Sequence, residues 1–268
     1  MENSRIKMIS GFYSGSDEDS RLIKTRQGQL EYFTTMHYIH RFINKDSKIL
    51  EVGAGTGRYS VTLAKEGYDV TAVELVKSNL EILQKKSKHL KNIQSFEGDA
   101  LDLSRFSDNT FDLTLVLGPL YHLYEKTDIN KAIDEAIRVT KRDGIIIVAF
   151  ISVYAILHAN FLYGNWDQGL ELNFTEDYQV KHFEEQLFTG YDIIEFEELF
   201  KNKNTEWVTT AGVDGPLEAV ERRSDFELTD SDFKKMAKWY LTIAEKRELL
   251  GLTNHLIYIC RKNNHLLK

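Results

Sequence analysis

The stretch that decides the fold runs from residue 49 to residue 59 and reads Ile49-Leu50-Glu51-Val52-Gly53-Ala54-Gly55-Thr56-Gly57-Arg58-Tyr59. An apolar strand pattern ends here in three glycines at alternate positions, and a helical pattern follows. Without side chains at Gly53 and Gly55 the turn can adopt positive φ and admit an adenosine-sized group, while the amides of the next helix can receive a carboxylate. A glycine-rich turn alone is a weak signal, so the neighbouring segments decide its meaning.

Strand and helix patterns alternate through the first half of the chain. The sequence predicts strands over residues 48–52, 69–74, 93–97, 111–117 and 144–152. It predicts helices over residues 20–43, 56–66, 78–88 and 126–139. Short turns between such elements imply right-handed crossovers. The expected fold is therefore α/β, with a doubly wound, mostly parallel sheet, helices on both faces and ligands at the carboxyl ends of the strands.

The pattern changes after Ser152. Residues 153–190 carry many aromatic side chains and no clear strand-helix-strand unit, which indicates a lid inserted into the fold. Its aromatic residues could wall a pocket for a flat, apolar or cationic substrate, or could simply form the core of the insertion. They are Tyr154, Phe161, Tyr163, Trp166, Phe174, Tyr178, Phe183 and Phe188. Beyond it we expect a helix around 192–201, a strand at 205–213, a helix over 231–250 and a strand at 255–261.

Composition and charge narrow the class of partner. The net charge of −7 disfavours a nucleic-acid substrate, because most of the surface would repel a phosphate backbone. The single cysteine, Cys260, excludes an intramolecular disulfide and a three-cysteine iron–sulfur centre. The polar start of the chain lacks a signal-peptide pattern, and no run approaches membrane-spanning length. We therefore expect a soluble, cytoplasmic protein with no membrane partner.

Acidic residues follow the successive strands at positions that suit a nucleoside. Glu51 lies two residues before the first glycine, and Glu74 ends the next strand, where it could accept hydrogen bonds from both ribose hydroxyls. Asp99 follows the third strand and could accept a hydrogen bond from an adenine amine. Arg58 stands where a dinucleotide fingerprint would have its last glycine, which counts against a nicotinamide cofactor.

With these motifs in this order, residues 46–152 resemble the class I (Rossmann-like) S-adenosylmethionine-dependent methyltransferases. The resemblance implies S-adenosylmethionine as cofactor and S-adenosylhomocysteine as product. It places the glycine turn around the methionine part, Glu74 at the ribose, and Asp99 with Ala100 at the adenine. Glu51 departs from the family's commoner aspartate but keeps the carboxylate. The expected cofactor-binding residues are Glu51, Gly53, Ala54, Gly55, Thr56, Gly57, Glu74, Leu75, Asp99, Ala100, Leu117, Gly118, Tyr13 and Arg21.

The fourth strand leads into Gly118-Pro119-Leu120-Tyr121-His122-Leu123. In the family this loop faces the transferable methyl group, and its form looks like that of a bacterial small-molecule subgroup. Tyr121 and His122 are therefore the candidate catalytic residues, although His122 could equally be a hydrogen-bonded structural residue. With neither an H-E-x-x-H motif nor a cluster of Cys and His ligands in the sequence, we expect no catalytic metal.

The N-terminal part, with Tyr13 and the acidic turn before Arg21, resembles the family's cofactor-covering extension. We thus expect one domain composed of covering helices (1–45), a cofactor-binding core (46–152), a lid (153–190) and the rest of the sheet (191–268). The expected activity is methyl transfer to an O, N or C nucleophile of a small molecule. A nicotinamide-dependent oxidoreductase and a non-catalytic cofactor-binding protein remain the alternatives, and the sequence leaves monomer and homodimer open.

Overall fold

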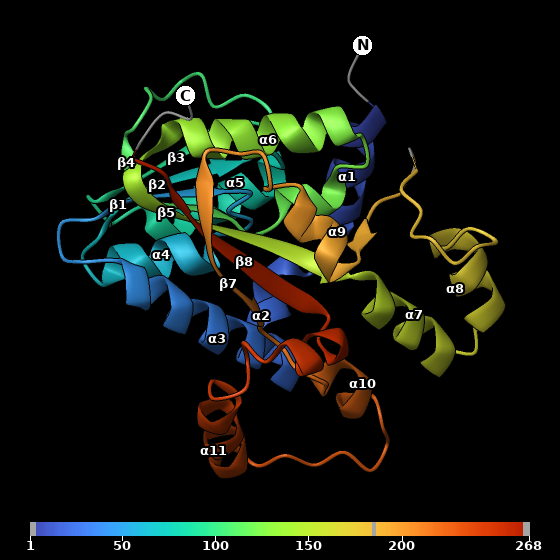
Figure 1. The fold of residues 1–268 in the computed structure, drawn as a ribbon. Coiled ribbons are helices and arrows are strands. Elements are labelled where there is room, and N and C mark those ends of the chain that lie inside the picture. Colours follow the sequence, from blue (N-terminus) through green and yellow to red (C-terminus); the bar gives the residue numbers. More distant parts are fainter. Residues whose placement is uncertain (1–3, 184–185, 265–268) are drawn as a thin grey trace.

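A single mixed sheet forms the centre of the molecule (Figure 1). The computed structural model describes residues 4–183 and 186–264. In spatial order the strands are β3 (Ile93–Glu97), β2 (Asp69–Glu74), β1 (Lys48–Val52), β4 (Phe111–Val116), β5 (Thr140–Ser152), β8 (His255–Lys262) and β7 (Thr205–Gly212). A short strand, β6 (Gly190–Tyr191), pairs with the end of β5. The first five strands run parallel and β8 runs antiparallel to both of its neighbours, so the expected fold class is confirmed.

Helices cover both faces of this sheet. Alternate residues of β5 point to opposite sides, so that Ile145 and Ile147 join one core cluster while Ile146 and Val148 join the other. This explains why the strand is almost continuously apolar. The first face is covered by α3 (Arg26–Phe42), α4 (Arg58–Lys65) and α11 (Asp230–Tyr240). The second is covered by α6 (Lys126–Val139) and α9 (Ile193–Glu198). A further helix, α5 (Lys77–Ser87), packs beside α4.

The N-terminal region differs from the single helix expected over 20–43. It contains α1 (Ser4–Gly15), a 3-10 turn η1 (Glu18–Ser20) and α2 (Arg21–Lys24) before α3 begins. Thr25 is extended, with φ −115° and ψ 156°, and its side chain accepts a hydrogen bond from the Gly28 amide at 3.0 Å. This N-cap breaks the predicted helix in two, because a capping residue must leave the helical conformation.

The C-terminal elements also differ in their bounds. The helix expected over 231–250 is α11, which stops at Tyr240 and is followed by a turn and a 3-10 helix, η3 (Arg247–Leu252). A short helix, α10 (Leu217–Glu221), follows β7. The Thr229 side chain accepts from the Asp232 amide and caps α11.

The inserted segment forms a helical hairpin beside the sheet (Figure 1). It consists of α7 (Val153–Leu162) and α8 (Trp166–Asn173). Most of its aromatic side chains are exposed, with 63% of Phe161 and 73% of Tyr178 accessible, so they do not form the buried core that one interpretation expected. Phe174 is buried. Among the described residues, no helix has the length and apolar character needed to cross a bilayer.

Candidate active site

The carboxyl ends of β1 to β4 meet at one cavity of about 930 Å³, a volume that includes the part open to solvent. Two covering elements, α1 and α2, complete its wall. Every residue that the sequence selected as a site residue lines this cavity except Gly57. Their roles toward a ligand stay predictions, but the chain does bring the predicted set together. The cavity also has a wall that sequence reasoning missed, formed by Arg5, Ile9, Glu18, Leu22, Arg58, Tyr59, Val76, Asn79, Gly98, Pro119 and Leu123.

The glycine turn leaves room where side chains would otherwise stand. Gly53 has φ +74°, and a Cβ atom there would lie 2.7 Å from the Cδ atom of Pro119. Gly55 has φ +55° and opens onto the cavity. Gly57 differs from the expectation, since it is absent from the cavity wall. With φ +82° it precedes α4, and a Cβ atom there would lie 2.7 Å from Leu83 Cγ, so it serves the packing of α4 on α5.

Two buried carboxyl groups stand at the ends of β1 and β2. Glu74 accepts hydrogen bonds from the amides of Gly55 at 2.6 Å and Val76 at 2.8 Å, while burial raises its pKa. Each carboxylate oxygen can accept a second hydrogen bond, so Glu74 can still serve ligand hydroxyls. Glu51 accepts from the amide of Ser60 at 2.9 Å and from its hydroxyl, and burial raises the pKa of Glu51 to about 8.

The third acid is paired across the cavity wall. Asp99 forms an ion pair with Arg5 of α1, whose side chain is buried, and it also accepts from the Leu101 amide at 3.1 Å. The spacing of Arg5, Ile9 and Tyr13, four residues apart, places these three side chains on one face of a helix. That spacing was the signal in the sequence that could have identified α1 as part of the site.

The loop that the resemblance places at the methyl group, here called the methyl-facing loop, is a 3-10 helix, η2 (Pro119–His122), and its two candidate catalytic residues are both engaged. The Nδ1 atom of His122 lies 2.6 Å from the Leu187 carbonyl oxygen, which can only accept, so Nδ1 carries the proton. Nε2 therefore accepts from the Tyr13 hydroxyl at 2.9 Å. Burial lowers the pKa of His122 to about 4 and raises that of Tyr121 above its usual range. An acid/base role for either residue stays a prediction that this geometry does not favour.

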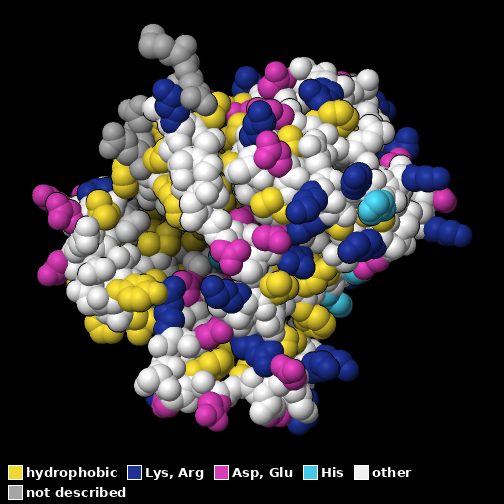
Figure 2. All heavy atoms as spheres, turned by 180° about the vertical axis from the view of Figure 1, so that it is seen from behind, with side chains coloured by type: hydrophobic (Ala, Val, Ile, Leu, Met, Phe, Trp, Pro, Cys, Tyr) yellow, Lys and Arg dark blue, Asp and Glu magenta, His cyan; other side chains and the backbone are white. Residues whose placement is uncertain are grey.

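Among the described residues of the insertion, one aromatic side chain approaches this loop. None of its aromatic residues lines the cavity, but the Phe188 ring lies 5.1 Å from His122 and 6.3 Å from Tyr121, between ring centroids. Seen from behind, the molecule is hollowed below α1, and hydrophobic side chains lie on the floor of the hollow (Figure 2). The predicted aromatic pocket wall is thus reduced to Phe188 at the methyl-facing loop.

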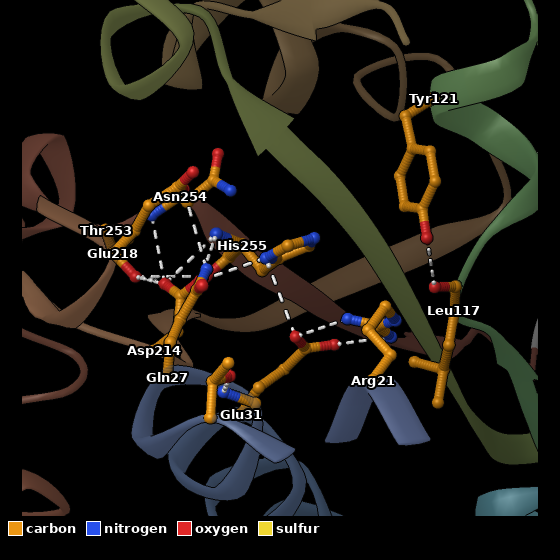
Figure 3. Close-up of polar contacts among 12 residues, drawn as sticks. Arg21, Gln27, Glu31, Leu117, Tyr121, Asp214, Glu218, Thr253, Asn254 and His255 are labelled. Atoms are coloured by element: carbon orange, nitrogen blue, oxygen red, sulfur yellow. Dashed lines mark hydrogen bonds and ion pairs between the residues drawn. The ribbon is translucent and has the colours of Figure 1, made fainter. Parts of the chain in front are cut away.

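A buried ion network lies at the same edge of the sheet and was not foreseen from the sequence (Figure 3). Glu31 of α3 accepts from Arg21 at 2.7 and 3.0 Å, and Asp214, which follows β7, lies 2.9 Å from His255 Nδ1. The amides of Asn254 and His255 and the hydroxyl of Thr253 also donate to Asp214.

Ligand atoms of Glu31, Asp214 and His255 lie within 4.8 Å of one another, a spacing at which a metal ion could be held. The carboxylates, however, already accept from Arg21, Gln27 and His255. The cluster therefore carries its own cations, and we interpret it as ion pairs.

The strand order and the cavity at the glycine turn define a doubly wound α/β fold, and solved methyltransferase structures share this fold. Residues 50–148 match the family model of the methyltransferase domain. The chain is 34% identical over 113 residues to a protein of Geobacillus sp. (strain WCH70) that is classed as a methyltransferase, and the match spans 41% of this chain and 45% of the relative. It therefore spans less than half the length of that relative.

Solved structures share this fold along most of the chain. A methyltransferase of Methanosarcina mazei has a TM-score of 0.56 at 16% identity, covering 85% of this chain and 98% of its own. Phosphoethanolamine N-methyltransferase 1 of Haemonchus contortus, in complex with phosphoethanolamine and S-adenosylhomocysteine, has a TM-score of 0.61 at 14% identity. That similarity covers 98% of this chain and 50% of the other.

Proposed function

We propose that this chain transfers a methyl group from S-adenosylmethionine to an O, N or C nucleophile of a small molecule. One observation carries the proposal: the glycine turn, Glu74, Asp99 and the methyl-facing loop follow four successive strands and all line one cavity. A nucleoside bound there would lie along the sheet edge with its reactive end at the loop. The net charge of −7 supports a small molecule rather than a nucleic acid as the acceptor.

The charges of the cavity suit this cofactor. Its wall contains the acids Glu18, Glu51, Glu74 and Asp99 and the bases Arg5, Arg21 and Arg58. The near balance of acidic and basic side chains fits a molecule with a carboxylate, an ammonium and a sulfonium group. The buried Nε atom of Arg58 has no hydrogen-bond partner among the described residues, and such a donor suits the cofactor's carboxylate. Glu74 would hold the ribose, and Asp99, steadied by Arg5, would meet the adenine.

When bound, the cofactor supplies an already activated methyl group, so alignment is the protein's main contribution. Good orientation is worth about 7–11 kcal/mol, whereas a general base adds roughly 10²–10⁴-fold. In this structure α1 covers the cavity. Its Arg5 forms an ion pair with Asp99, and its Tyr13 is hydrogen-bonded to His122. These two contacts hold α1 over the cavity and would keep water from the reacting atoms.

Calorimetric titration with S-adenosylhomocysteine tests the cofactor assignment. We expect Glu74→Ala and Asp99→Ala to weaken binding at least tenfold, which is about 1.4 kcal/mol, while the exposed Glu81→Gln binds like the parent chain. A parallel titration with NADH tests the nicotinamide alternative. Wild-type affinity in both cavity variants, or preferential binding of NADH, would refute the assignment.

Methyl transfer itself needs a separate experiment, because a non-catalytic relative could keep the cofactor site. Incubating the chain with methyl-labelled S-adenosylmethionine and a mixture of small metabolites should move the label into an acceptor. Tight binding of S-adenosylhomocysteine without any transfer would favour the non-catalytic binding protein.

A further inference from the structure

Two cationic side chains present hydrogen-bond donors beside the methyl-facing loop. His255 begins β8 and lies opposite Ile151 near the end of β5, at the edge of the sheet where the cavity lies. Its ring centroid is 6.4 Å from that of Tyr121. In Figure 3 the far side of the His255 ring points away from Asp214, toward Tyr121 and Arg21. Tyr121 and Arg21 line the cavity, and His255 lies next to them, outside the cavity lining. Nε2 of His255 has no partner among the described residues.

Arg21 also has donors left over. Its Nε atom donates to Glu18, and one N–H from each terminal nitrogen goes to Glu31. A guanidinium has five N–H groups, so two remain after these three bonds. Arg21 and a protonated His255 therefore each keep N–H groups that no described residue accepts, and neither side chain offers an acceptor of its own.

Two carboxylates, Asp214 and Glu31, pair with His255 and Arg21. Asp214 is fully buried and lies against Nδ1 of His255, and Glu31 lies 3.6 Å from the same nitrogen while it holds Arg21. This arrangement fixes both cationic groups in place before any ligand arrives, because each is already paired with a buried carboxylate. The pairing with Asp214 and Glu31 also keeps the ring of His255 in its charged form, and the Nε2–H group points away from Asp214.

We propose that His255 and Arg21 form a subsite for a carboxylate of the methyl-accepting molecule, with Tyr121 and Phe188 as its aromatic walls. The inference rests on the proposed function and names the substrate class for the same site. A carboxylate can accept from both donors, and charge-assisted hydrogen bonds of this kind are the stronger ones. An ammonium group would meet N–H donors and no free acceptor among the described residues, because Asp214, Glu31 and Glu18 are already engaged by His255 and Arg21, so a cationic acceptor is disfavoured. A neutral amide would keep the hydrogen bonds but lose the charge.

The subsite should depend on pH in one direction. Groups from four other elements face His255: Asp214 after β7, Glu31 of α3, Arg21 of α2 and Glu218 of α10. The two nearest carboxylates outweigh the effect of burial and raise the pKa of His255 to about 9. Binding of a carboxylate is therefore expected to be constant near pH 7 and to weaken as the pH rises through about 9, where the Nε2 proton is lost.

Three probes of one shape test the proposal: benzoate, benzamide and benzylamine, each titrated into the full chain saturated with S-adenosylhomocysteine. We expect benzoate to bind at least tenfold more tightly than the other two at pH 7. His255→Asn should weaken benzoate at least tenfold and leave S-adenosylhomocysteine affinity within twofold. The matched control is His40→Asn, which removes an exposed histidine that is also paired with a carboxylate, Glu66, on another part of the surface.

The outcomes separate this inference from the proposed function. Equal or tighter binding of benzylamine or benzamide, or no benzoate binding at 20 mM, would overturn the carboxylate subsite while cofactor binding stays intact. Loss of S-adenosylhomocysteine binding in the parent chain would instead contradict the proposed function. If His255→Asn does not fold, the parent chain still tests the subsite. Its affinity for benzoate must decrease as the pH rises through about 9, and the NMR chemical shifts of the His255 ring nitrogens must change when benzoate binds.

Discussion

Glu51 gives the sharpest test of how the cavity affects stability. It is buried at the end of β1, hydrogen-bonded to Ser60, and its pKa is about 8 in the folded chain against an ordinary value of 4.5. The folded state thus binds this proton more tightly than the unfolded state. The resulting stabilisation is complete below pH 4.5 and is lost as the pH rises through about 8.

The size of this loss follows from the interval between the two pKa values. At 1.36 kcal/mol for each pH unit, the interval from 4.5 to about 8 corresponds to roughly 5 kcal/mol. Glu51→Gln keeps the shape of the side chain without the charge, so it should escape the loss. We expect the variant to be more stable than the parent by about 3–5 kcal/mol at pH 8, or about 10 °C in Tm, and by less than about 1 kcal/mol at pH 5.

Urea and thermal unfolding of both chains at pH 5, 6, 7 and 8 measure the difference directly. Glu81→Gln, an exposed substitution on α5, is the control and should show no such trend. A stability difference that stays constant between pH 5 and pH 8 would refute the reasoning, since it would mean that the carboxyl group is not destabilised by burial. A parallel loss of S-adenosylhomocysteine affinity in Glu51→Gln would indicate that the acid is kept for binding at the expense of stability.

Three further substitutions test the roles of Gly57, Thr25 and His122. Gly57→Ala should lower the free energy of unfolding by about 1–3 kcal/mol, because φ is +82° and the new Cβ would meet Leu83, yet it should leave S-adenosylhomocysteine affinity unchanged; calorimetry of the folded variant that shows weaker binding would return Gly57 to the cofactor site. Thr25→Ala removes the N-cap of α3 and should cost about 1 kcal/mol in urea unfolding, and an unchanged midpoint would show that the cap is dispensable. For His122→Gln, methyl transfer at saturating cofactor should keep the parent's pH profile between pH 5 and 8, since the pKa of His122 is about 4; loss of a limb in that range would restore it as an acid/base residue.

The core of the fold could be read from the sequence because its signals are local. The strands at 48–52, 69–74 and 93–97 have the predicted bounds, since each joins an apolar run to a nearby turn. The helix after the glycine turn begins at Arg58 rather than Thr56 because the turn extends through Gly57, which adopts positive φ.

The rest of the site depends on contacts between distant residues. Helix α1 has no marked apolar face, and it is fixed by Arg5 to Asp99, 94 positions away, and by Tyr13 to His122, 109 positions away. Isolated short helices are marginal in water, so the spacing of Arg5, Ile9 and Tyr13 can mark one face of a helix but does not show where that helix packs. Likewise, Asp214 and His255 are 41 positions apart, and only the antiparallel pairing of β7 with β8 brings them together.

The position of β8 has a consequence for how the chain is made. During synthesis β7 emerges before β8, yet β8 is the strand that separates it from β5 in the finished sheet. Until β8 arrives, both β5 and β7 expose edges that can pair with strands of other molecules. Damage to this late segment should therefore appear first as poor yield and aggregation in the cell, while the half of the sheet that carries the glycine turn can already be assembled.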